Sequence, residues 1–105
     1  MIKRLLHSMS RQDRILNTLS KELKAENIEL YNDSYKHAHH APMKGLEDKN
    51  ETHFRLDIVS PRFTGLTRVA RHRLVYASLK DEFESGLHAL QITSAKTLQE
   101  LEKQR

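Results

Sequence analysis

The strongest constraint on the fold of this chain is a strict alternation of apolar and polar side chains over residues 53–60. Phe54, Leu56 and Ile58 share one face of this segment, and polar residues occupy the positions between them. Successive side chains of a β-strand point to opposite faces, so the alternation predicts a strand that packs on one side only. The fold must therefore contain a sheet with one covered face.

A helix and another strand follow this segment. Thr67 can cap a helix that runs to about Glu84, Gly86 ends it, and residues 87–93 predict a further strand. We expect the helix to face the sheet with an apolar stripe. The stripe consists of Val69, Tyr76, Leu79 and Phe83, broadened by Leu66, Ala70, Leu74 and Ala77.

Two elements precede the alternating strand. Ser10 and Asp13 form a capping pair for an amphipathic helix that extends to about Glu26, and residues 28–35 predict a modest strand. Residues 36–50 contain proline, glycine, three histidines and a run of charged residues, a composition typical of an exposed connection.

A short helix over residues 97–103, with Leu98 and Leu101 facing inward, completes the order α-β-β-α-β-α. This order predicts an α+β fold in which helices cover one face of a three-stranded sheet. With 105 residues the chain has room for one small domain and no large enclosed active site. We place that domain at residues 13–105.

Residues 1–12 form a basic N-terminal segment. Lys3, Arg4, Arg11 and Arg14 are opposed only by Asp13, with serines and apolar residues between them. Mitochondrial import signals have this character, and a frayed basic terminus is the alternative interpretation.

The composition limits the chemistry that the chain can perform. It has seven histidines and no cysteine, so its own metal ligands would be imidazole or carboxylate groups. No apolar run approaches the roughly 20 residues that span a bilayer, and no membrane partner is expected. The net charge of +4 favours acidic or phosphate-bearing partners only weakly.

The order of elements and a series of short motifs resemble the BolA-like family. The motifs are the Ser-Tyr-basic-His turn at residues 34–37, THF at 52–54, VS at 59–60, FxG at 63–65, RHR at 71–73, VY at 75–76 and HAL at 88–90. No single motif is rare, but their joint order is specific, and the match covers roughly residues 14–95. Two features depart from the family pattern: the connection after His37 is long and rich in histidine, and it lacks the cysteine that some members carry.

The resemblance implies a type II KH-like fold and a partnership with a monothiol glutaredoxin. The two proteins would share a 2Fe-2S cluster, with glutathione supplying one thiolate. It also implies a non-enzymatic role in the delivery of clusters to recipient apoproteins, in the mitochondrial matrix or alternatively in the cytosol. A 2Fe-2S cluster needs about four ligands, and two imidazoles can replace two thiolates on one iron, so a chain without cysteine fits a shared cluster.

Two histidines are the candidate metal ligands. His88, from the HAL motif, is the first, with a structural histidine bonded to a backbone carbonyl as the alternative. His37, from the turn motif, is the second, with His40 and His39 as alternatives in the same connection. Short histidine-rich tracts also occur as solvated loops without a ligand role. His72 falls on the apolar stripe and is expected to be structural, and His53 is expected to be a bystander.

Arg68, Arg71 and Arg73 are candidate partner-binding residues, because they lie on the basic part of the predicted helix. We expect Arg68 and Arg71 to face solvent together with Glu82, and a solvated charged face is the alternative interpretation. A DNA-binding regulator like bacterial family members is the competing hypothesis. The chain has no GxxG sequence and few aromatic residues, so nucleic acid is not the expected partner. No nucleophile with an evident base, phosphate loop or carboxylate pair predicts an enzyme.

Overall fold

The computed structural model describes residues 9–34 and 51–104, and within them it has the predicted order of elements. Helix α2 (Arg11–Glu22) precedes strands β1 (Asn27–Asn32) and β2 (His53–Val59), and the short 3-10 helix η3 (Pro61–Phe63) follows. Then come α3 (Arg68–Ser78), α4 (Lys80–Glu84), β3 (Ala89–Lys96) and α5 (Leu98–Lys103). The strands form one sheet in the order β1-β2-β3, so β2 is central.

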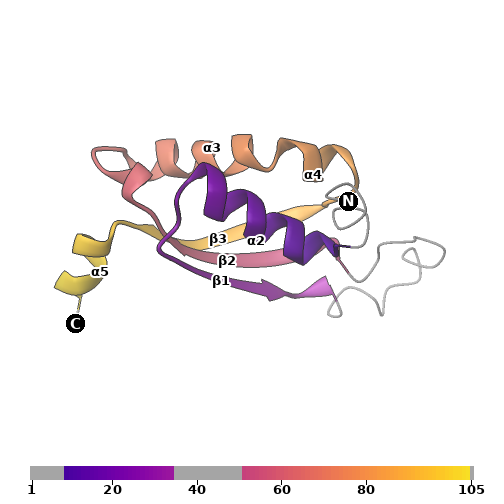
Figure 1. Ribbon diagram of the computed structural model, residues 1–105, viewed down its shortest axis with the longest axis horizontal. Coiled ribbons are helices and arrows are strands. Elements are labelled where there is room, and N and C mark those ends of the chain that lie inside the picture. The colour runs from indigo at the N-terminus through magenta and orange to yellow at the C-terminus, as the bar shows by residue number, and fades with distance from the viewer. Residues whose placement is uncertain (1–8, 35–50, 105) are drawn as a thin grey trace.

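The sheet is mixed, because β1 pairs with β2 in antiparallel fashion and β3 pairs with β2 in parallel. Helices α2, α3 and α4 lie over one face of the sheet, and α5 lies beyond one end of it (Figure 1). The predicted α+β fold with helices covering one face of a three-stranded sheet is therefore confirmed. The parallel pairing brings the first residues of β2 and β3 to the same end of the sheet.

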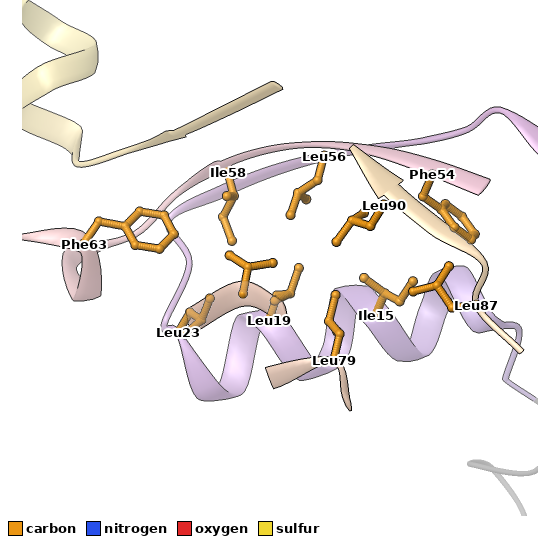
Figure 2. Packing of buried hydrophobic residues seen from close by; sticks show 11 residues of the cluster. Ile15, Leu19, Leu23, Phe54, Leu56, Ile58, Phe63, Leu79, Leu87 and Leu90 are labelled. Carbon is orange, nitrogen blue, oxygen red and sulfur yellow. The ribbon is translucent and has the colours of Figure 1, made fainter. Parts of the chain in front are cut away.

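The core lies between α2, α3 and the covered face of β2 (Figure 2). The predicted inward positions Phe54, Leu56 and Ile58 are all buried. Ile15, Leu19 and Leu23 of the first helix meet them at four-residue spacing, so one stripe of α2 enters the core. The remaining core residues are Phe63, Val75, Leu79, Leu87 and Leu90.

The first helix is capped as predicted. The Ser10 side chain accepts a hydrogen bond from Asp13 N. The helix ends at Glu22, and Lys24 takes a left-handed φ of 50° as the chain turns into β1. The helix begins at Arg11, so residues 11 and 12 of the predicted N-terminal segment belong to its first turn.

The apolar stripe predicted for the long helix is confirmed in part. Leu79 is buried, and Leu74 and Phe83 pack against the core, as expected. Val69 is 57% exposed and Tyr76 40%, whereas Val75, which was not assigned to the stripe, is buried. The physical reason is that Arg71 and Glu82 face inward, because each finds an oppositely charged partner in the fold. The helix is also divided at Leu79 into α3 and α4.

The C-terminal part differs in two further respects. β3 extends to Lys96 rather than ending at residue 93. α5 is held by a capping box between Thr97 and Glu100, but Leu98 is 44% exposed and does not point inward as expected. No helix in the described ranges is long and apolar enough to cross a membrane.

Candidate functional site

The candidate site lies at the end of the sheet where β2 and β3 both begin. His53 is the first residue of β2 and pairs with Ala89, the first residue of β3. His88 directly precedes Ala89, so the parallel register brings the two histidines together. Their ring centroids are 5.0 Å apart, and the ring planes are inclined by 48°.

The backbone fixes the position of His88. The N–H groups of His88 and Ala89 both donate to the carbonyl of Thr52, at 2.9 and 3.0 Å. The His88 side chain is exposed, as a ligand shared with another protein would need to be. His53 is half-buried, and its Nδ1 lies 2.8 Å from the hydroxyl of Thr52. The structure therefore pairs His88 with His53, which we expected to be a bystander.

Ser34, which follows β1, is hydrogen-bonded to the start of β2 beside His53. Its hydroxyl oxygen accepts hydrogen bonds from Thr52 N at 2.9 Å and His53 N at 3.0 Å. The side chain of Asn32 accepts from Ser34 N in turn, at 2.9 Å. Both ends of the connection between β1 and β2 thus meet beside His53. His37, His39 and His40 belong to that connection and lie outside the described residues.

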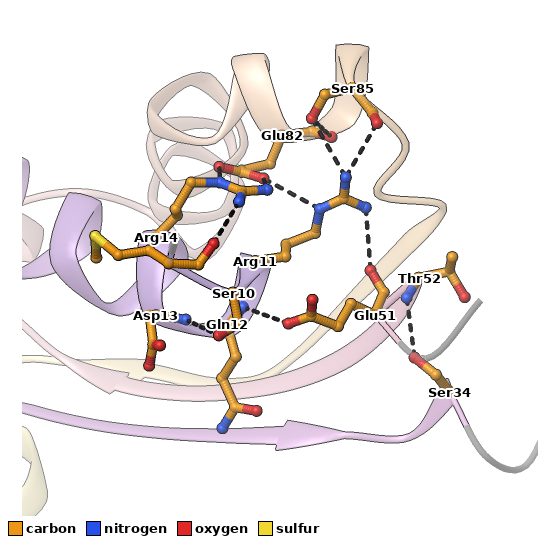
Figure 3. A network of polar contacts seen from close by, with 11 residues as sticks. Ser10, Arg11, Gln12, Asp13, Arg14, Ser34, Glu51, Thr52, Glu82 and Ser85 are labelled. Carbon is orange, nitrogen blue, oxygen red and sulfur yellow. Dashed lines mark hydrogen bonds and ion pairs between the residues drawn. The ribbon is translucent and has the colours of Figure 1, made fainter. Parts of the chain in front are cut away.

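A charged cluster next to this end joins α2 to α4 (Figure 3). Glu82 accepts from Arg11 Nε at 3.1 Å, from Arg14 Nε at 2.8 Å and from Arg14 Nη2 at 3.0 Å. Arg11 and Glu82 are both buried. Two of the four cations of the basic N-terminal stretch therefore serve the fold, which leaves Lys3 and Arg4 for the import hypothesis.

The three candidate partner-binding arginines fall in different environments. Arg68 and Arg73 are exposed, whereas the side chain of Arg71 is only 12% exposed. Arg71 donates to both carboxylate oxygens of Glu100, at 2.6 and 3.0 Å, and to the carbonyls of Leu66 and Ala95. Arg71 is thus a structural cation that fastens α5, contrary to the expectation that it faces solvent.

The Arg71 contact also changes the acidity of Glu100. Hydrogen bonds from the Arg71 side chain, and then from the backbone N–H of Thr97, lower the pKa of Glu100 from 4.5 to about 2. Arg68, Arg71 and half-buried His72 line a polar groove of about 680 Å³ beside β3 and α5. His72 is thus only partly covered and faces this groove rather than the apolar core.

The donor chemistry fits a metal centre that is completed by another molecule. Within residues 9–34 and 51–104, no three histidine or acidic side chains come close enough to hold a metal ion. The sequence has no cysteine, so the chain offers nitrogen ligands and no thiolate. A pair of imidazoles at an open end of a sheet can occupy two positions of a cluster whose other ligands come from a partner.

Comparison with known proteins places this architecture in a defined class, the small α+β domains seen in solved BolA structures. The BolA domain of SufE1 from Arabidopsis thaliana has a TM-score of 0.74 and 48% identity, covering 88% of this chain and 96% of that one. BolA1 from Arabidopsis thaliana has a TM-score of 0.73 and 45% identity, covering 84% and 93%. A model of the BolA-like protein family matches residues 19–100. The chain belongs to the BolA-like family.

Curated relatives have varied names. UV-induced protein uvi31 of Schizosaccharomyces pombe is 68% identical over 101 residues, which are 96% of this chain and 99% of that protein. Protein BOLA1, chloroplastic, of Arabidopsis thaliana is 48% identical over 81% of this chain, which spans about half (52%) of that protein. The DNA-binding transcriptional regulator BolA of Vibrio cholerae is 42% identical over 77% of this chain and 70% of that protein.

The proximity of His53 to His88 is the feature that sequence reasoning missed, although a signal was present. The THF and HAL motifs each place a histidine at the start of a strand, and a helix separates the two strands. Such a strand-helix-strand unit usually has parallel strands, whose starts lie at the same end of the sheet. The two histidines could therefore have been paired from the sequence.

Proposed function

We propose that this chain is a non-enzymatic iron-sulfur cluster assembly and transfer factor that binds a monothiol glutaredoxin. The two proteins share a 2Fe-2S cluster together with glutathione, and the complex helps deliver clusters to mitochondrial apoproteins. The observation that carries the proposal is the adjacency of His53 and His88 at an accessible end of the sheet, in a chain without cysteine.

Ligand chemistry supports a shared cluster. About four ligands are needed, and two imidazoles on one iron are compatible with thiolates on the other. The partner's cysteine and glutathione would provide the thiolates, and His88 would provide one nitrogen. In this role the chain binds and orients a cluster and performs no covalent chemistry on a substrate.

The second nitrogen has two possible origins in this chain. His37, or His40 or His39 as alternatives, is the choice that the family resemblance implies. Three peptide units separate His37 from Ser34 and span at most about 11 Å, so chain length permits His37 to reach the histidine end of the sheet. His53 is the alternative that its 5.0 Å ring separation from His88 supports.

Substitution of each histidine in turn tests this proposal. The purified chain is mixed with cluster-loaded monothiol glutaredoxin, and the visible absorption and circular dichroism spectra are recorded. We expect a changed spectrum with the wild type and with His72→Ala, the control on α3, and no change with His88→Ala. The same loss with either His37→Ala or His53→Ala identifies the second ligand. Identical spectra for wild type and His88→Ala would reject the assignment.

The mitochondrial matrix is the proposed location, with the cytosol as the alternative. Support comes from the basic N-terminal stretch and from relatives whose names are organellar, such as the chloroplastic protein BOLA1. Cell fractionation combined with a pull-down tests it, because recovery with a mitochondrial glutaredoxin is expected and recovery only from the cytosol would contradict it.

DNA binding is the second candidate function, favoured by the name of the Vibrio cholerae relative and by exposed Arg68 and Arg73 on α3. Retention on duplex DNA with a preferred sequence at physiological salt would support it. Retention that disappears at that salt concentration indicates charge attraction alone.

A further inference from the structure

We propose that Arg11 is a positioning residue that fixes the two histidine-bearing segments relative to each other and to α2. This inference rests on the proposed function for its consequence, because it concerns the same pair of histidines. The claim that Arg11 fixes these two segments concerns the folded chain alone, and it can be tested without a cluster.

One side of the Arg11 guanidinium holds the turn that leads to His88. Nη2 donates to the carbonyl of Ser85 at 3.0 Å, and Nε donates to Glu82 at 3.1 Å (Figure 3). Leu87 N donates to the carbonyl of Glu82 at 2.8 Å, which closes the turn. Arg11 thus contacts the chain three residues before His88 and at the residue on which the turn closes.

The other side of the guanidinium holds the segment that leads to His53. Nη1 donates to the carbonyl of Glu51 at 3.1 Å. The Glu51 side chain accepts from Gln12 N at 3.0 Å, which attaches the same residue to the first turn of α2. Thr52, the next residue, supplies the carbonyl that holds the N–H of His88.

The arrangement depends on the shape of the arginine side chain. A guanidinium is a flat group with donors on three nitrogens, so one side chain reaches Glu82, Ser85 and Glu51 at once. A lysine ammonium keeps the charge but is a single point on a flexible stem, so it does not bridge all three. Arg11 is 2% exposed, so water does not replace a lost contact there.

Gly86 makes room for the guanidinium. A Cβ at this position would lie 3.2 Å from Nη2 and 3.3 Å from Nη1 of Arg11, and the glycine has a φ of 130°. Both the space and the backbone conformation therefore favour glycine between Ser85 and the histidine segment.

Arg14 provides a matched comparison. Within the described ranges, its side-chain hydrogen bonds go to Glu82 and to the carbonyl of Met9 rather than to Glu51 or Ser85. Arg14→Lys therefore weakens the ion cluster at Glu82 while it leaves the Arg11 bonds to Glu51 and Ser85 in place.

The first test compares Arg11→Lys with Arg14→Lys by amide hydrogen exchange in the free protein. We expect Arg11→Lys to accelerate exchange at the His88 and Ala89 amides by about five- to tenfold relative to Leu56, the change that loss of about one hydrogen bond produces. Arg14→Lys should leave that ratio unchanged. Equal acceleration at all three amides in Arg11→Lys, or none at His88 and Ala89, would overturn the inference.

A second variant protects the test against a failure to fold. Gly86→Ala keeps every charge, pushes against Nη1 and Nη2 of Arg11 and also strains the backbone at a φ of 130°, so it should loosen the same two amides. If Gly86→Ala leaves exchange at His88 and Ala89 unchanged relative to Leu56, the positioning role is wrong even where Arg11→Lys is insoluble.

The consequence for the cluster is tested in the complex with cluster-loaded monothiol glutaredoxin. At equal folded fraction, Arg11→Lys should shift the visible circular dichroism spectrum while Arg14→Lys reproduces that of the wild type. An Arg11→Lys spectrum identical to wild type, with His88→Ala still abolishing the signal, would refute the positioning role alone. An unchanged spectrum in His88→Ala would refute the proposed function, and amide exchange then still decides the role of Arg11.

Discussion

Glu82→Gln removes the negative charge that balances Arg11 and Arg14 while it preserves the size of the side chain. In the wild type the carboxylate accepts three hydrogen bonds from the two arginines. The glutamine amide has one oxygen acceptor and one N–H₂ donor. In the variant, some of the arginine N–H groups therefore face the amide N–H₂ group, which is a donor like themselves. Among the described residues, neutral oxygens of the new amide, of the Glu51 and Ser85 carbonyls and of the Ser85 hydroxyl would then face the buried charge of Arg11.

The magnitude follows from burial. Arg14 is one third exposed (33%), so solvent screening limits its share, whereas Arg11 is 2% exposed. Loss of one partner of a buried ion pair costs roughly 3–5 kcal/mol, and we expect about 3 kcal/mol because the amide oxygen and the carbonyls remain. In a domain of this size, that lowers the Tm by roughly 12–24 °C.

Urea and thermal unfolding followed by circular dichroism measure this change. Glu84→Gln is the matched control, because it removes the same charge from an exposed position of the same short helix. The control should stay within about 0.5 kcal/mol of wild type. If Glu82→Gln unfolds within that range as well, the cluster does not stabilise the fold as argued.

Three further predictions concern other parts of the fold. Ser60→Ala should lower the free energy of chemical unfolding by about 1–3 kcal/mol, because the buried hydroxyl donates to the carbonyl of Leu23 and accepts from Arg62 N. A decrease no larger than for alanine at an exposed serine such as Ser20 would contradict this. Leu19→Ala should cost about 2–5 kcal/mol, because Leu19 is fully buried in the core, and an unchanged urea midpoint would contradict this. The Glu100 carboxyl should titrate near pH 2 by NMR, and its pKa should move back toward 4.5 in Arg71→Met. Because the pKa is lowered in the folded state, the contribution of Glu100 to stability is present above about pH 4.5 and is lost as the pH falls toward 2. A Glu100 midpoint near 4.5 in the wild type would show that the Arg71 contact is absent in solution.

The elements that local patterns determine were predictable from the sequence. Strict alternation identified β2 and three of its four buried residues, and short polar side chains identified the helix starts at Ser10 and Thr67. Each of these signals depends only on neighbours in the chain, either the alternation of a strand or the unpaired N–H groups of a helix start.

The inward face of α3 and α4 was not predictable in the same way. The helical periodicity considers the hydrophobicity of each residue and not its partners, and it assigned Val69 and Tyr76 to the core. Instead, Arg71 and Glu82 face inward and pair with Glu100 and Arg11, which lie 29 and 71 residues away in the sequence. Buried ion pairs between distant residues leave no periodic signal in a single sequence.

The same limit applies to the candidate site. His88 was proposed from a motif, whereas its contact with His53 depends on the parallel register of β2 and β3. The anchoring of both segments by Arg11 depends on the packing of α2 against them.

Nitrogen coordination by this chain is the central claim, and pulsed electron paramagnetic resonance tests it directly. The chain is labelled with ¹⁵N-histidine, assembled with unlabelled glutaredoxin, glutathione and cluster, and reduced. We predict a strong ¹⁵N hyperfine coupling to the cluster spin that disappears in His88→Ala. Absence of any ¹⁵N coupling in the wild-type complex would contradict the proposed ligation.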